Sequence, residues 1–517
     1  MQGFTLAEAL PMKLRSTLAA ALLACAAFPA AAQNIVLILS DDQGWTGTSV
    51  QMDARVRNSV SDLYRTPSLE RLAAEGMTFS NAYSPAPNCS PTRMSIQTGK
   101  TAARLGATDI IDVVPDEEGR AGIQFFYDAM YVNKPMNVPL PISDLAEEEV
   151  TIAEFLKAHD PNYATGHFGK WHMGGDNPEL HGYDAHNGIT TNAPGDQGLP
   201  DPKRTDEVTD ETVRFIAEQA AAGNPFFVQA SYYAVHTPVL AKAETVQDFN
   251  GLIVPEPPTG GPFGRFVNLV HTNTVYAGMT ADLDAGVGRI LDALDEHGLA
   301  DSTYVIYTSD NGGESDLPVT SNVPLAWGKT HVWEGGIRVP LFIRGPGIDG
   351  GTRSDVPAIG YDFFATIADW VGASGPLPEN QDGGSLHGVL TNGGEGAVER
   401  GTEPLVWYYG AYRNMKQVAP QTAIRRGNHK LIWELDSGRT YLYDLDLDLS
   451  ETTDLSAFRP EVAASLHEEL KAYLAAVGTT LPTHNPDYDP AADRAMISVT
   501  RPTPPPGTPP GQLAPSE

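Results

Sequence analysis

The chain has 517 residues, of which 41% are hydrophobic, and its 34 Lys and Arg residues against 65 Asp and Glu residues give a formal net charge of −31. This length exceeds one small core and predicts a large α/β domain with a smaller second domain. The acidic balance argues against nucleic acid as a partner, because nucleic acids bind to basic surfaces. Local Lys and Arg residues can still form a pocket for an anionic substrate.

The N-terminus is typical of a secretion signal. A short basic stretch that starts at Met12 precedes an Ala/Leu-rich run, which ends in small residues at Ala32. The run is too short to remain as a membrane span. We therefore expect residues 1–32 to be removed from an exported, periplasmic or secreted protein without stable membrane insertion; the alternative is a lipoprotein anchored at Cys25. Cleavage after Ala32 leaves Cys89 as the sole cysteine, which indicates a reactive or modified thiol.

Polar residues follow three apolar runs that are typical of strands buried in a parallel sheet. Residues 34–40 lead into Asp41-Asp42, residues 225–231 lead toward His236, and residues 303–309 lead into Asp310-Asn311. Carboxyl ends of such strands converge on one edge of the sheet, where ligands bind. Carboxylate and amide oxygens suit a hard divalent cation. The plainer interpretations are a solvated turn capped by one Asp and an ordinary core histidine.

The remaining pattern of the first 395 residues alternates helices and strands. Helices are predicted over 66–76, 151–159, 209–222 and 274–297, and further strands over 77–82 and 341–344. Lys170 and His172 are two residues apart, so on an extended strand they would face the same way and suit an anionic ligand. Lys329 follows a glycine in a polar loop and could join them.

The pattern of apolar and polar residues changes after about residue 395. Short apolar runs at 405–409, 422–425, 430–433 and 440–444 predict an antiparallel sheet, and residues 462–477 predict a helix that covers one face. We therefore divide the chain into a catalytic domain at 33–395, a C-terminal subdomain at 396–485 and a Pro-rich disordered tail at 486–517.

The most specific motif is Cys-x-Pro-x-Arg-x-x-x-x-Thr-Gly-Lys, which starts at Cys89. If the segment enters a helix, Cys89 and Arg93 lie one turn apart, and a thiol beside a guanidinium could be a nucleophile of low pKa. The plainer alternative is a buried cysteine near a structural arginine. The Thr-Gly-Lys end is not a phosphate-binding P-loop, because Met94 stands where that loop needs Gly.

Taken together and in order, these motifs resemble the formylglycine-dependent sulfatases of the alkaline phosphatase superfamily. The residues that carry the resemblance are Asp41-Asp42-Gln43-Gly44, Cys89 to Arg93 with Thr98-Gly99-Lys100, Gly169-Lys170-Trp171-His172, His236-Thr237-Pro238, Ser309-Asp310-Asn311-Gly312, Gly328-Lys329, Arg425 to Leu431 and Leu442 to Leu445. The resemblance implies an α/β fold like that of alkaline phosphatase. A large mixed, mostly parallel sheet would be flanked by helices, and a smaller C-terminal α+β domain would be built on an antiparallel sheet.

The resemblance also implies the chemistry. Cys89 would be oxidised by a maturation enzyme to formylglycine, whose hydrate has one hydroxyl that attacks sulfur and a second that expels sulfate. One Ca²⁺ would be held by Asp41, Asp42, Asp310, Asn311 and the residue-89 oxygen. Arg93 would steady formylglycine, Lys170 and Lys329 would hold sulfate, His236 or Lys329 would assist the leaving group, and His172 would serve elimination.

Several questions stay open at this stage. Leu449 stands where family members often have Pro, which concerns a turn rather than the chemistry. Residues 105–140 and 176–205 follow no family pattern and are expected to shape the pocket, with His181, His186 and His331 as candidate substrate contacts. The substrate is a sulfate-ester small molecule or a sulfated glycan. The alternatives are a phosphonate or phosphodiester hydrolase that uses the same formylglycine, and a non-catalytic, Ca²⁺-dependent sulfoglycan-binding protein.

Overall fold

The computed structural model describes residues 33–490, except 112, 116–120, 124–132, 193–194, 251, 253–269, 316–318, 402 and 414–417. The predicted signal at 1–32, residues 491–517 of the predicted tail and part of the segment 105–140 therefore lie outside the described residues. Among the residues described, no helix combines the length and apolar character that a membrane span requires.

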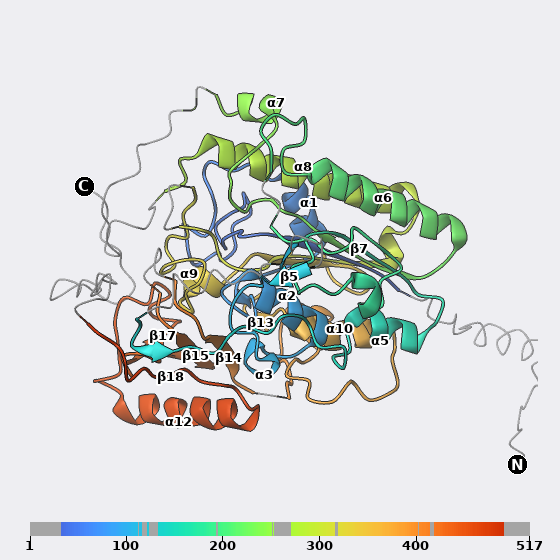
Figure 1. Cartoon of the computed structure of the whole chain (residues 1–517). Coiled ribbons are helices and arrows are strands. Elements are labelled where there is room, and N and C mark those ends of the chain that lie inside the picture. Colours follow the sequence, from blue (N-terminus) through green and yellow to red (C-terminus); the bar gives the residue numbers. More distant parts are fainter. Residues whose placement is uncertain are drawn as a thin grey trace, which may run out of the picture.

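An eight-stranded sheet forms the centre of the fold (Figure 1). Its order is β12 (Thr352–Ser354), β2 (Met77–Phe79), β11 (Leu341–Arg344), β10 (Thr303–Ser309), β1 (Asn34–Ser40), β9 (Phe226–Ser231), β7 (Ala164–Gly169) and β8 (Ala185–His186). Only β11 runs against the others, since β10 and β2 both pair with it antiparallel while the remaining pairs are parallel. The predicted mixed, mostly parallel sheet is confirmed.

Alternate residues of β1 enter two different cores. Ile35, Leu37 and Leu39 pack into one cluster, while Val36 and Ile38 pack into the other. The first layer holds α2 (Cys89–Thr98), α5 (Ile152–His159) and α10 (Asp362–Trp370); the second holds α1 (Pro67–Glu75), α6 (Thr205–Ala222) and α8 (Thr274–Glu296). Figure 1 shows these two helix layers on opposite faces of the sheet.

A separate antiparallel sheet follows in the C-terminal region, as predicted. It contains β14 (Leu405–Tyr409), β15 (Gln421–Arg426), β16 (His429–Glu434) and β17 (Thr440–Asp444) in that order. One face packs against α12 (Pro460–Ala476) through residues such as Leu431 and Leu470, and the other packs against the catalytic region through Trp407 and Tyr83.

The described chain also contains short elements. These are β3 (Ala82–Tyr83), α3 (Ala102–Leu105), β4 (Val113–Pro115), β5 (Ala121–Ile123), β6 (Met136–Asn137), α7 (Ala243–Gln247), α9 (Glu334–Ile337), β13 (Ala358–Ile359), α11 (His387–Leu390), β18 (Thr483–His484) and two 3₁₀ turns at Pro178–His181 and Ala300–Ser302. The prediction of one strand over 77–82 was wrong. β2 ends at Phe79, and β3 starts at Ala82 and pairs in another sheet.

Candidate active site

The carboxyl ends of β1, β9 and β10 bring the predicted polar residues to one edge of the sheet. β1 and β10 pair in parallel up to Ser40 and Ser309, so the next residues of both strands are neighbours. The Asp42 backbone N–H donates to Asp310 Oδ1 over 3.1 Å, and Asn311 Nδ2 donates to Asp42 Oδ1 over 2.7 Å. The segment after β9 bonds to Asp41 through the backbone, which leaves His236 Nε2 3.6 Å from Asp42 Oδ2.

Cys89 is the first residue of α2 and points at this cluster. Its Sγ lies 3.7 Å from Asp41 Oδ1, and the residue is 1% exposed. Burial raises the pKa of the Cys89 thiol to about 12, although Lys170 and Lys329 act in the opposite direction. This raised pKa does not favour the hypothesis of a low-pKa thiol nucleophile, since only a thiolate attacks.

Three buried cations bind the three carboxylates. Arg93 donates to Asp310 Oδ2 from Nε (3.1 Å) and Nη2 (2.8 Å), and its Nη1 donates to the Lys170 carbonyl (2.7 Å). Lys170 Nζ lies 2.7 Å from Asp41 Oδ2, and Lys329 Nζ lies 2.6 Å from Asp42 Oδ1. Charges this deeply buried require partners, and here each has one.

The electrostatics of Asp42 follow from these neighbours. Burial alone would raise the pKa of its carboxyl, but Lys329, His236 and Lys170 hold that pKa well below its usual range. Burial lowers the pKa of His236 to about 3, with Lys329 adding to the effect and Asp42 opposing it. The site therefore pairs the ionised Asp42 carboxylate with the neutral His236 imidazole.

Glycines let the three polar loops approach each other. A Cβ on Gly312 would lie 1.9 Å from the Gly335 carbonyl, one on Gly44 would lie 2.2 Å from Asn322 Oδ1, and one on Gly328 would lie 2.4 Å from the Gly313 carbonyl. A side chain at any of these positions would push the loops apart. The glycines of the Asp-Asp-Gln-Gly, Asp-Asn-Gly and Gly-Lys motifs thus serve the packing of the site.

Lys170 and His172 do not share a strand face, so that prediction was wrong. β7 ends at Gly169, and His172 has a φ of +55° with its backbone N–H bonded to the Thr190 carbonyl. Asp42 is also left-handed, at a φ of +61°. Non-glycine residues held in this region store strain, which occurs most often at functional sites.

The three histidines predicted as candidate substrate contacts, His181, His186 and His331, lie in three different environments. His181 is buried and packs on Trp171 with ring centroids 5.6 Å apart. It therefore lies in the core and not, as expected, at a position that contacts substrate. His186 Nδ1 accepts the Gly188 N–H at 3.0 Å. His331 stacks on Trp327 at 4.7 Å beside Lys329.

The donor set could hold a metal ion. Ligand atoms of Asp41, Asp42, Cys89 and His236 lie within 4.8 Å of one another. Asn311 Oδ1 is buried and has no hydrogen-bond partner among the described residues, although its Nδ2 is engaged. Carboxylate oxygens with one unsatisfied amide oxygen match a hard divalent cation. His236 takes part in this cluster, a position that the sequence did not assign to it.

One buried cation at this edge was missed by the sequence analysis. Lys203 lies just before α6, is 2% exposed, and its Nζ has no hydrogen-bond partner among the residues that the structure describes. Burial lowers its pKa to about 8, while Asp41 raises the pKa again. No sequence motif includes this lysine, because it lies in the segment 176–205, which follows no family pattern.

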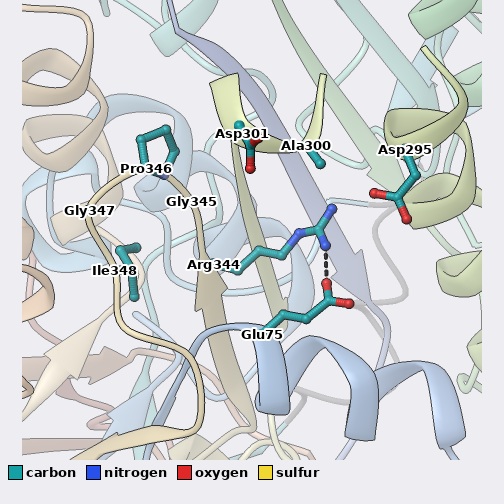
Figure 2. Close-up of a pocket in the computed structure, with 9 residues that line it drawn as sticks. All are labelled: Glu75, Asp295, Ala300, Asp301, Arg344, Gly345, Pro346, Gly347 and Ile348. Atoms are coloured by element: carbon teal, nitrogen blue, oxygen red, sulfur yellow. Dashed lines mark hydrogen bonds and ion pairs between the residues drawn. The ribbon is translucent and has the colours of Figure 1, made fainter. Parts of the chain in front are cut away.

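A pocket of about 600 Å³ lies at the opposite edge of the sheet. In Figure 2, Arg344 points toward Glu75, and the two side chains form an ion pair. Arg344 pairs with Val305 near the start of β10, far from the strand ends that carry the site. The remaining lining residues are Asp295, Ala300, Asp301, Gly345, Pro346, Gly347 and Ile348. Acidic groups predominate there, so this pocket does not suit an anionic substrate.

Comparisons with known proteins agree with this geometry. The sulfatase family model matches residues 33–373, and a model for the N-sulphoglucosamine sulphohydrolase C-terminal region matches residues 326–478. A sulfatase from Formosa agariphila is 28% identical over 85% of this chain and 88% of its own length. N-acetylgalactosamine-6-sulfatase from Canis lupus familiaris is 27% identical over 70% and 66%.

A solved structure shares the fold. Ps i-CgsB, in complex with k-i-k-neocarrahexaose, superimposes with a TM-score of 0.66 at 23% identity and covers 86% of this chain and 92% of its own. Together with the family match over most of the chain, these findings show that the protein belongs to the sulfatase family and is a sulfuric ester hydrolase.

Proposed function

We propose that this protein is an exported, Ca²⁺-dependent carbohydrate sulfatase whose nucleophile is formylglycine made from Cys89. The observation that carries the proposal is the position of Cys89. Its side chain starts α2, points at Asp41 and lies among buried cations, yet burial raises the pKa of its thiol. A side chain so placed but so unreactive suits conversion to another nucleophile better than thiol chemistry.

The lysines are arranged to bind an anion. An ammonium group has three N–H donors, so Lys170 and Lys329 can each hold an Asp oxygen and still donate to a sulfate oxygen. Both are anchored by carboxylates and deeply buried, so they need little reorganisation when negative charge develops on the substrate.

Formylglycine and Ca²⁺ would supply the remaining chemistry. Formylglycine would supply, as its hydrate, one hydroxyl to attack sulfur and a second to release sulfate by elimination. Ca²⁺, held by Asp41, Asp42, Asp310 and Asn311 near residue 89, would supply positive charge that favours an ionised oxygen and polarises the sulfate group. Arg93 holds Asp310 in place for this role.

A hydrogen bond of His236 helps to decide whether His236 or Lys329 assists the leaving group. The Thr237 carbonyl can only accept, so the neutral His236 ring carries its hydrogen on Nδ1 and presents Nε2 as an acceptor. Lys329 Nζ carries hydrogens and faces the same carboxylate, Asp42. Lys329 is therefore assigned the proton that the leaving alcohol oxygen takes up, and His172 keeps its role in elimination.

The named relatives support a sugar as the alcohol. One is an N-acetylgalactosamine-6-sulfatase, and one structural neighbour is in complex with a neocarrahexaose. The secretion signal expected at residues 1–32 would place the enzyme outside the cytoplasm, where sulfated glycans are met, after a maturation enzyme has acted on Cys89.

Turnover of matched substrates tests the proposal. The protein is produced together with a formylglycine-generating enzyme and assayed with a panel of monosulfated sugars, 4-nitrophenyl sulfate and a phosphodiester. Release of sulfate from a sugar, lost in Cys89→Ala, is expected. Preference for the phosphodiester would favour the phosphonate or phosphodiester hydrolase, and binding of sulfated sugars without any hydrolysis would favour the non-catalytic alternative.

A further inference from the structure

Lys203 is a buried cation whose charge is not neutralised by any described partner. The residue is 2% exposed, and its Nζ makes no hydrogen bond among the described residues. An unpaired buried ammonium is costly, and folded proteins keep one chiefly where function requires it. An anionic ligand at Nζ would offset this cost.

The fold directs Lys203 to the catalytic edge of the sheet. α6 connects β8 to β9, and a helix between parallel strands runs back across the sheet, so it begins at the edge where the strands end. The Asp201 carboxylate accepts the backbone N–H groups of Thr205 (2.8 Å) and Asp206 (2.7 Å), which fixes the turn that carries Lys203.

A contact of the next residue agrees with this position. The Arg204 guanidinium lies 5.5 Å from the centre of the Tyr233 ring, three residues before His236. Besides burial, which lowers the pKa of Lys203, the strongest effects on this pKa come from site residues: Asp41 and Asp42 raise it, and Lys170 and Lys329 lower it. Asp41 and Asp42 are already bonded to Lys170 and Lys329, so Lys203 is a surplus cation in the pocket.

We propose that Lys203 is a substrate-binding residue whose Nζ donates to an oxygen of the sulfate group that the enzyme removes. The inference rests on the proposed function and adds a third ammonium to Lys170 and Lys329 around the anion. An anionic oxygen could also come from a second sulfate or a carboxylate elsewhere on a glycan, and the substrates below separate these two sources.

The test compares Lys203→Met with wild type in the full, Ca²⁺-loaded chain. With 4-nitrophenyl sulfate, whose only anionic group is the one removed, kcat/KM should fall about 10–100-fold, chiefly through KM, as for loss of a hydrogen bond to a charged group. The affinity for inorganic sulfate, measured by calorimetry, should fall by a similar factor. Tm should stay the same or rise, because the variant removes an unpaired buried charge.

A matched control is Lys242→Met. Lys242 Nζ pairs with Asp206 at 2.7 Å, so this variant removes one positive charge from the same helix end without touching the pocket. It should leave both kcat/KM and sulfate affinity unchanged. If Lys203→Met folds poorly, Lys203→Gln keeps a polar group of similar length and carries the same test.

Unchanged sulfate affinity with a lowered Tm in the position-203 variants would overturn the inference and make Lys203 structural. A loss confined to a disulfated sugar would overturn the assignment to the removed sulfate. A wild-type protein that hydrolyses no sulfate ester but binds sulfate through Lys203 would refute the proposed function, and it would support Lys203 as a sulfate-binding residue only.

Discussion

Lys430 lies at the centre of a buried ion network that joins the C-terminal sheet to the catalytic region. From β16, its Nζ lies 2.9 Å from Glu334 Oε1 and 2.9 Å from Glu451 Oε1, the second contact being an ion pair without hydrogen-bond alignment. Glu334 also binds Arg338 Nε at 2.7 Å. Glu334 begins α9, five residues after Lys329, so the network also anchors the loop that carries a sulfate-binding lysine.

Replacing Lys430 with Met keeps the aliphatic stem and removes the charge. Glu334 retains Arg338, but Glu451 is left fully buried with only the Glu334 N–H, at 2.7 Å, as a direct partner among these contacts. Breaking a buried pair from one side costs about 3–5 kcal/mol. We expect a loss of that size at pH 8 in the free energy of unfolding, and recovery of most of it in the double variant Lys430→Met/Glu451→Gln.

The loss should depend on pH. Burial raises the pKa of Glu451 to about 7, while Lys430 lowers it. The folded state thus binds this proton more tightly than the unfolded chain, so the stability that Glu451 contributes is present below its ordinary pKa near 4.5 and is lost as pH rises toward 7. Without Lys430 the pKa rises further. The variant should therefore lose much less stability at pH 5, where Glu451 is protonated, than at pH 8.

Urea unfolding followed by tryptophan fluorescence at pH 5 and pH 8 measures both effects. Lys471→Met is the control, because Lys471 is exposed and its pair with Glu468 on α12 lies at the surface. This variant should unfold like wild type. Equal losses for Lys430→Met at the two pH values, or a loss below about 1 kcal/mol at pH 8, would refute the reasoning about the buried network.

Three further changes test the site. Arg93→Met removes the guanidinium that pairs with buried Asp310, so it should cost about 3–5 kcal/mol of stability and abolish turnover. A variant with normal Tm would contradict this. Gly99→Ala, at a φ of +70°, should cost at least about 1–2 kcal/mol, more if Gln381 cannot move; an unchanged urea midpoint would contradict it. Chelation of Ca²⁺ should lower the Tm of wild type but not of Asp310→Asn; equal shifts would exclude Asp310 as a ligand.

The sequence predicted the parts of the site that follow directly from strand ends. Asp41 and Asp310 come straight after apolar runs, and the pairing of parallel strands makes such residues neighbours. The mostly parallel sheet and the antiparallel C-terminal sheet were predictable for the same reason, since each run has the length and apolar pattern of its strand type.

The features that the sequence did not predict depend on contacts between distant segments. Nothing local shows that β7 stops at Gly169 or that His172 adopts a left-handed conformation, because the loop near Thr190 decides both. Lys203 lies in a polar stretch that looks like an ordinary surface loop, and only its place before α6 brings it to the site. Glu451 likewise becomes a buried partner of Lys430 only through the docking of the C-terminal sheet.

The central claim is that the working nucleophile at position 89 is not a thiol. Mass spectrometry of the peptide that contains Cys89, from protein made with a formylglycine-generating enzyme, tests this directly when it is paired with sulfatase turnover of the same samples. We predict that residue 89 loses its sulfur and that turnover rises in proportion to the converted fraction. Full turnover in protein whose Cys89 is entirely unmodified would contradict the account.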